Sequence, residues 1–162
     1  MADCLKADNK KTAERLIYVH KGGNFDKRKF VPIKNRAFSN KPTGGFWASA
    51  ENAVYGWRDW CRDNDFNNSG SKICRFWLKE NCSILVIDSV KKALTIPDRG
   101  DAPGEHTLRC IFPVLPDFEK ISTKYDAIDF RISEDTGLYK TLYGWDCDSI
   151  LVLNPDVIEV IG

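Results

Sequence analysis

Three short segments of the chain carry side chains that could bind an aromatic ligand and stabilise a positive charge developing on it. His20 ends an apolar run and is followed by Lys21 and two glycines. The aromatic pair Phe46 and Trp47 follows a glycine turn, and Asp148 precedes a late apolar run. Histidine and carboxylate groups move protons and stabilise charge, whereas a flat ring can stack on a heteroaromatic group.

In the first segment, His20 is followed closely by glycines, whose backbone can adopt conformations that other residues avoid. A single histidine at the end of a strand is more often a structural or surface residue than a functional one, and that alternative stays open here. The following Lys21 and Gly22 favour a functional role for His20. Glycine lets a ligand approach the backbone closely, so that amide groups can bind a carboxamide or an anion.

The second segment predicts a helix with an aromatic face. Ser49 is expected to cap this helix, in which apolar residues recur at spacings of three and four: Ala50, Ala53, Val54, Trp57, Trp60 and Cys61. For Trp60 we expect a place in the core. The consecutive Phe46 and Trp47 must point to opposite sides, so one of them can line a cavity.

The third segment contains two acids, Asp146 and Asp148, before a predicted strand over residues 149–153. Alternate residues on a strand share a face, so the two carboxylates are expected to lie side by side. For Asp146 an alternative stays open, in which its side chain lies in solvent at the start of the strand. A carboxylate at the mouth of a buried strand, as expected for Asp148, can hydrogen-bond ribose hydroxyls and stabilise an oxocarbenium ion.

The elements that must position these segments are mostly short strands. Apolar runs predict strands over 15–20, 73–78, 83–87, 127–132, 149–153 and 157–161. Loops are expected over 24–41, 64–71, 97–104 and 133–145. Residues 79–81 are read as a hairpin connection and residues 89–94 as a short helix, while 127–132 alternates like a half-buried strand. Prolines leave residues 108–124 ambiguous. The predicted class is α+β.

Length and composition predict one folded domain. The 162 residues are 43% apolar and 12% aromatic, which is enough for a substantial core. We expect residues 1–14 to be a loose polar tail and residues 15–162 to form the domain. The chain has 24 basic and 23 acidic residues, a balance that argues against a general grip on nucleic-acid phosphates.

Cysteine usage argues against metal chemistry and for a reducing compartment. The six cysteines include no Cys-x-x-Cys pair, and only two histidines accompany them, so no metal site is expected. The first apolar run, residues 16–19, is too short for a secretory leader, and no run is long enough to span a membrane. We therefore expect reduced cysteines, a cytoplasmic location and no membrane partner.

In their order along the chain, the three segments resemble the ADP-ribosyltransferase superfamily. The closest branch is the one with a histidine, an aromatic residue and an acid (diphtheria-toxin-like and poly-ADP-ribose-polymerase-like). Residues 18–22, Tyr-Val-His-Lys-Gly, look like its histidine strand. Residues 44–49, Gly-Gly-Phe-Trp-Ala-Ser, look like its aromatic strand, and residues 148–157 look like its acid before a strand. The resemblance implies two small packed antiparallel-rich sheets with flanking helices around an NAD cleft.

The resemblance also implies a role for each residue. The residues assigned to NAD binding are His20, Lys21, Gly22, Phe46, Trp47, Ser49 and Trp57. Catalysis is assigned to Asp148 and His20, and weak contacts with the acceptor to Asp146, Tyr143 and Trp145. Three positions depart from the family: Lys21 separates the histidine from glycine, Phe46 replaces a tyrosine, and Asp148 replaces the usual glutamate.

The implied activity is transfer of ADP-ribose from NAD, as co-substrate, to a macromolecular acceptor with release of nicotinamide. A protein acceptor is favoured, with nucleic acid as the alternative. Compact members of the family are often toxins, effectors or phage-borne modifiers of a host. Three other functions stay open: an NAD glycohydrolase, an RNA 2′-phosphotransferase-like enzyme and a non-catalytic binding module. The phosphotransferase would use basic residues such as Arg28, Lys34, Arg36 and Lys41.

Overall fold

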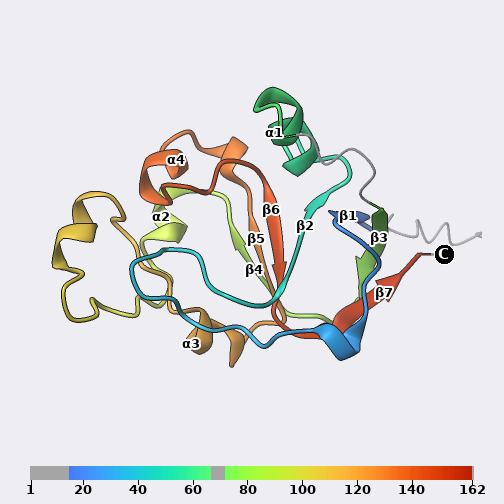
Figure 1. The fold of residues 1–162 in the computed structure, drawn as a ribbon, viewed down its shortest axis with the longest axis horizontal. Helices are drawn as coiled ribbons and strands as arrows, with labels where there is room; N and C mark the ends of the chain where they lie inside the picture. Colours follow the sequence, from blue (N-terminus) through green and yellow to red (C-terminus); the bar gives the residue numbers. More distant parts are fainter. Residues whose placement is uncertain (1–14, 67–71, 162) are drawn as a thin grey trace, which may run out of the picture.

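Seven strands form one sheet in the part of the chain that the computed structural model describes, residues 15–66 and 72–161. Their order across the sheet is β4-β5-β6-β2-β1-β3-β7 (Figure 1). The strands are β1 (Tyr18–Lys21), β2 (Phe46–Ala50), β3 (Ile73–Leu78), β4 (Ile84–Ile87), β5 (Ala127–Phe130), β6 (Ser149–Val152) and β7 (Ile158–Val160). Among the pairings between these seven strands, only β4–β5 is parallel. The predicted α+β class is confirmed.

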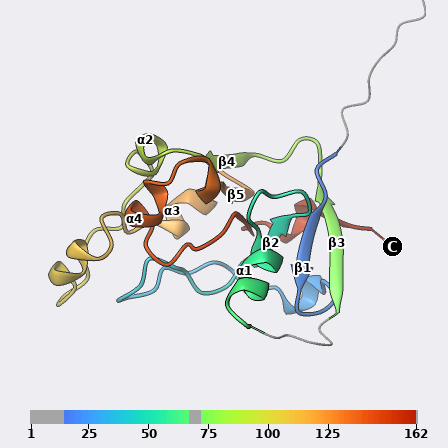
Figure 2. The same cartoon turned by 90° about the horizontal axis from the view of Figure 1, so that it is seen from above.

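The helices are short and lie at the ends and edges of the sheet (Figure 2). The α-helices are α1 (Trp57–Asp63), α2 (Val90–Ala93), α3 (Phe118–Ser122) and α4 (Leu138–Thr141). The 3₁₀ turns are η1 (Lys27–Lys29), η2 (His106–Cys110), η3 (Ile132–Glu134) and η4 (Pro155–Val157). The short helix expected over 89–94 is confirmed as α2. The expectations for the tail over 1–14 and for the loop tip over 67–71 lie outside the described residues.

The expected pair of packed sheets is wrong, because β2 joins both groups of strands into one sheet. Trp47 pairs with Leu151 of β6, and Ala50 pairs with Tyr18 of β1. One edge of β2 is therefore bonded to the group β4-β5-β6 and the other to the group β1-β3-β7, as Figure 1 shows. Two apolar cores pack against the sheet, one containing Ile128 and the other Phe76. The second core also includes Ile150 of β6, so it spans both groups of strands.

The helix expected from Ser49 to Cys61 is only half present. Residues 46–50 form β2, because their backbone groups pair with both β1 and β6, and this ladder overrides the helical spacing of the side chains. Helix α1 starts at Trp57 instead, after Gly56 in an extended conformation. The Gly56 N–H donates to the Asp59 carboxylate at 3.0 Å, which satisfies one backbone donor at the helix start.

Two further expectations about strands are wrong. Residues 79–81 do not close a hairpin, because β3 pairs with β1 and β7 while β4 lies at the other edge beside β5. Strand β5 is buried along its whole length, rather than on alternate residues, because both of its faces are covered: Ile128 and Phe130 lie in one apolar core and Ala127 in the other. Asp129 is tolerated there because its carboxylate accepts a 2.8 Å hydrogen bond from Arg131. Burial nevertheless raises the pKa of Asp129.

A buried ion pair holds the long loop that precedes β2. Glu105 is fully buried, and its carboxylate accepts hydrogen bonds of 2.6 and 2.7 Å from Arg99. The same carboxylate accepts from the backbone N–H of Phe38, and the Arg99 hydrogen bonds lower the pKa of Glu105 to about 2. Further along the loop, Asn40 donates to the carbonyl oxygen of Tyr143 at 2.6 Å. These contacts fix the position of Lys41, the next residue of the loop.

Candidate functional site

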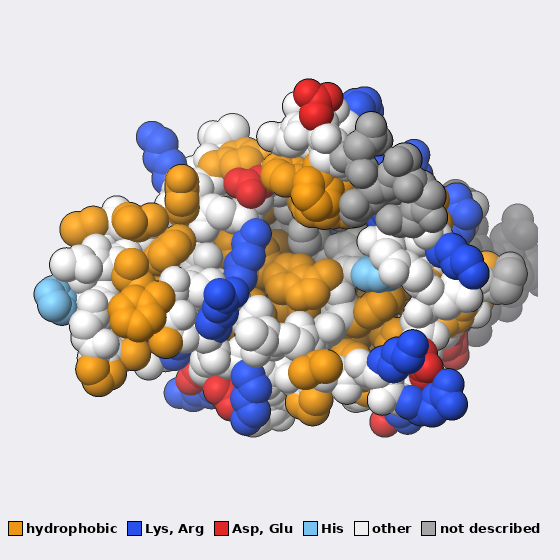
Figure 3. Space-filling model, viewed as in Figure 1, with side chains coloured by type: hydrophobic (Ala, Val, Ile, Leu, Met, Phe, Trp, Pro, Cys, Tyr) orange, Lys and Arg blue, Asp and Glu red, His pale blue; other side chains and the backbone are white. Residues whose placement is uncertain are grey.

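A pocket of about 340 Å³ opens between β1, β2, α1 and the loop that leads into β6. Figure 3 shows it as a hollow in the middle of one face of the molecule. The side chains that could act on a ligand from its walls are Trp47, Trp57, Trp60, Trp145, His20, Lys21, Lys41, Asp146, Cys147 and Ser149. All three segments singled out in the sequence contribute to this lining, so the fold brings them together.

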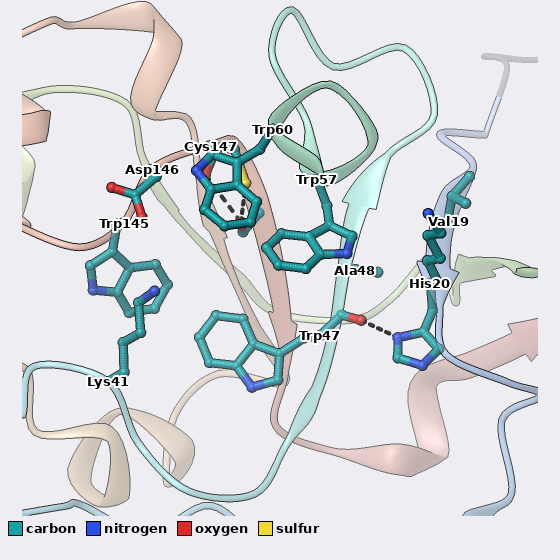
Figure 4. A pocket seen from close by; sticks show the side chains of 12 residues that line it. Val19, His20, Lys41, Trp47, Ala48, Trp57, Trp60, Trp145, Asp146 and Cys147 are labelled. Atoms are coloured by element: carbon teal, nitrogen blue, oxygen red, sulfur yellow. Dashed lines mark hydrogen bonds between the residues drawn. The ribbon is translucent and has the colours of Figure 1, made fainter. Parts of the chain in front are cut away.

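Indole rings form most of the wall. Trp57 and Trp60, one helical turn apart on α1, stack with their ring centroids 4.9 Å apart and their planes only 10° from parallel. Trp47 lies opposite them and packs against Trp145 at 5.2 Å (Figure 4). Phe46 points to the other face of β2 and packs against the ring of His20 at 4.3 Å. The predicted division of the aromatic pair is therefore confirmed, with Trp47 on the pocket side.

His20 lies at the opposite side of the pocket from Asp146, and one of its ring nitrogens is committed (Figure 4). Its Nδ1 lies 2.6 Å from the carbonyl oxygen of Trp47, which can only accept, so Nδ1 carries the proton. In the tautomer protonated at Nδ1 alone, Nε2 has a lone pair to offer. A Cβ on Gly22 would lie 2.9 Å from this Nε2, which explains why glycine follows so closely in the chain.

The backbone after His20 is already bonded. The N–H groups of Gly22 and Gly23 both donate to the carbonyl oxygen of Lys72 at 3.1 Å, and Gly22 does not line the pocket. Lys21 does line it. A carboxamide that binds backbone in this part of the site must therefore use groups other than the Gly22 amide.

Ser49 organises the site from within the protein. The side chain is 5% exposed, and its Oγ donates to the carbonyl oxygen of Asp148 at 2.7 Å. The same oxygen accepts from the backbone N–H of Trp57 at 2.9 Å. Ser49 thus caps α1 from the neighbouring strand rather than from the preceding residue. One hydroxyl connects β2, the first residue of α1 and the entry to β6.

The two acids before β6 have different surroundings, which contradicts the expected side-by-side arrangement. Asp146 is exposed and lines the pocket, and no hydrogen bond or ion pair within the described residues occupies its carboxylate. Asp148 is 9% exposed and lies outside the lining. Its carboxylate accepts from the backbone N–H and the hydroxyl of Ser133, at 2.8 and 2.6 Å. The regular strand begins only at Ser149, so strand alternation does not apply to residues 146–148.

Of the other residues expected to contact an acceptor, Trp145 lines the pocket and Tyr143 does not. Trp145 is 2% exposed, with its ring centroid 3.7 Å from that of Phe130, so only one part of the ring reaches the pocket. Lys41 extends across it, with Nζ 5.8 Å from the ring centroid. Tyr143 is 58% exposed and lies outside the lining.

The sequence did not single out Trp60, Cys147 or Ser149 as wall residues. Trp60 was expected in the core, although its spacing of three from Trp57 already placed both rings on one helical face. Cys147 lies on the lining close to Ser149, with Sγ 3.6 Å from the Ser149 hydroxyl, and burial raises the pKa of its thiol. Nothing in the sequence distinguished this cysteine from the others.

Within residues 15–66 and 72–161, no group of histidine, cysteine and acidic side chains could hold a metal ion, and no helix is long and apolar enough to cross a membrane. Two of the basic residues considered for a phosphotransferase are paired with acids, Arg28 with Asp26 and Lys34 with Glu119, both at 2.9 Å. Comparisons with family models, with curated proteins and with solved structures gave no match to this chain.

Proposed function

We propose that the tryptophan-walled pocket binds NAD and that the protein transfers ADP-ribose from it to an acceptor, with release of nicotinamide. The observation that carries this proposal is the pairing of an aromatic pocket with a histidine whose tautomer is fixed. The rings of Trp47, Trp57 and Trp60 offer flat surfaces to a heteroaromatic group. His20 offers Nε2 as an acceptor for a ribose hydroxyl.

Asp146 takes the role of the charged catalytic group in this proposal. The C1′–N glycosidic bond of NAD breaks with its electron pair moving to the pyridinium nitrogen, which leaves nicotinamide neutral and the ribosyl group as an oxocarbenium ion. A carboxylate on the pocket lining stabilises that cation electrostatically. The acceptor then forms a bond to C1′ through a lone pair, and the proton it loses passes to the carboxylate or to water.

Asp148 acts as a positioning residue in the same proposal. Its carboxylate already accepts two hydrogen bonds from Ser133, and its carbonyl oxygen accepts a third from Ser49. Those bonds anchor the loop that carries Asp146 and Trp145. This revises the role expected from the resemblance, in which the acid directly before the strand contacts the ribose.

The decisive experiment follows a label on the adenosine half of NAD in a cell lysate that contains the purified protein. We expect label on a macromolecule with the wild-type chain and a rate lower by about 10²-fold with Asp146→Asn, as for loss of one electrostatic contact in other active sites. Asp148→Asn should keep most of the rate, because an amide can still accept from Ser133. Glu80→Gln, at an exposed position, serves as the matched control.

Each remaining outcome has a definite meaning. Free labelled ADP-ribose without labelled macromolecule would make water the acceptor and the protein an NAD glycohydrolase. A large loss with Asp148→Asn but not with Asp146→Asn would restore the catalytic role to Asp148. NAD that stays intact in every lysate would refute the proposal. The identity of the labelled molecule would then decide whether the protein acts as a toxin, effector or host modifier, as the resemblance suggests.

A further inference from the structure

A second, smaller pocket adjoins the tryptophan pocket. It has a volume of about 160 Å³ and lies between β1, the turn over residues 51–56 and the start of α1. Val19, Lys21 and Trp57 line both pockets, so the two pockets adjoin at these residues. The rest of the lining combines small residues with charged and polar ones: Ala50, Ala53, Gly56, Ser49, Glu51, Arg58 and Asp59.

The charges around the second pocket leave two cations without an acidic partner. The carboxylate of Glu51 accepts from Arg75 at 2.8 Å, and that of Asp59 accepts from Arg62 at 3.2 Å. Lys21 and Arg58, in contrast, have no acidic group within 4.0 Å in the described part of the chain. Both cations are therefore available to an anion that enters this pocket.

The volume of the tryptophan pocket indicates which part of a ligand the second pocket would bind. At about 340 Å³ it lies near the lower end of the roughly 300–1,000 Å³ that small-molecule sites occupy, so it suits a base and its ribose rather than a whole dinucleotide. Resting on the proposed function, we infer that the second pocket binds the diphosphate of NAD through Lys21 and Arg58. A guanidinium group binds phosphate oxygens in pairs, and an ammonium group binds them as a point charge.

The test compares Arg58→Gln with Arg28→Gln by calorimetric titration of the folded chain. Arg28 is the control, because it pairs with Asp26 and lines neither pocket. We expect Arg58→Gln to raise the Kd for NAD and for ADP-ribose by about tenfold, the effect of losing one charged hydrogen bond, and Arg28→Gln to leave both unchanged. Nicotinamide alone should bind both variants and the wild type equally.

The outcomes separate this inference from the proposed function. If the wild-type protein binds NAD and Arg58→Gln binds it equally well, the diphosphate site is refuted while the tryptophan pocket stands. If inorganic pyrophosphate binds the wild type but NAD affinity is insensitive to Arg58, the second pocket serves the phosphate of a different molecule, and the inference is again wrong. If NAD does not bind the wild-type protein at all, the proposed function fails first.

Discussion

Removal of the Ser49 hydroxyl should loosen the whole site, because this one oxygen connects three of its elements. Ser49→Ala deletes the bond to the carbonyl oxygen of Asp148 and the bond from the N–H of Trp57. A typical hydrogen bond contributes about 0.5–1.5 kcal/mol, so the two together predict a loss of about 2 kcal/mol in the free energy of unfolding. For a domain of this size that loss lowers Tm by about 4–8 °C.

The assay is thermal and urea unfolding of Ser49→Ala, followed by tryptophan fluorescence because Trp57 is directly affected. Ser122→Ala is the control, since its hydroxyl donates only to the carbonyl oxygen of Glu119 within the same helix. We expect the control to lose less than half as much stability. Equal losses in the two variants would refute the role of Ser49 as the connection between β2, α1 and the entry to β6.

Three further predictions concern the scaffold of the site. In urea unfolding, Gly44→Ala should lower the free energy of unfolding far more than Gly100→Ala. Both glycines have positive φ, but only at Gly44 would a Cβ lie 2.3 Å from a backbone oxygen, that of Pro32. Equal losses of stability in the two variants would contradict this close approach. Glu105→Gln should lower Tm, and the difference from the wild type should be largest above the ordinary glutamate pKa of about 4.5. The difference should shrink as the pH falls toward 2, because the folded-state pKa of Glu105 is lowered to about 2. A Tm difference that does not depend on pH would refute the ion-pair account. Thiol labelling of the folded protein, read by mass spectrometry, should modify the exposed Cys110 quickly and the buried Cys147 slowly, and the opposite order would contradict the burial of Cys147.

The sequence predicted those elements whose signal is local. Continuous apolar runs located β3, β4 and β6 to within a residue or two, and Ser89 marked the start of α2. The positive φ angles of Gly44 and Gly45 confirm the turn before β2. Each of these features depends on side chains close together in the chain, which the sequence displays directly.

The errors arose where partners distant in the sequence decide the structure. Residues 50–61 have helical spacing, but pairing of Ala50 with Tyr18 and of Trp47 with Leu151 keeps the first part in a strand. Strand β5 was expected to be half-buried because its own sequence does not show that residues distant in the chain cover both of its faces.

The candidate site follows the same rule. Its location at His20, Trp47 and Trp57 was predicted, and the pocket does gather these side chains. The sequence did not predict that Asp146 lines the pocket while the Asp148 side chain is buried. That difference depends on Ser133, which lies 15 residues from Asp148 in the chain. Only the folded structure brings Ser133 to the carboxylate of Asp148.

Titration of the purified protein with NAD, beside Trp57→Leu, tests the central claim most directly. Trp77→Leu is the control, because Trp77 lies on β3 outside the pocket. We predict one-to-one binding to the wild type and to Trp77→Leu, with affinity at least several-fold weaker in Trp57→Leu, as loss of a stacking contact requires. Absence of NAD binding to the wild type, or equal affinity in all three proteins, would contradict the account.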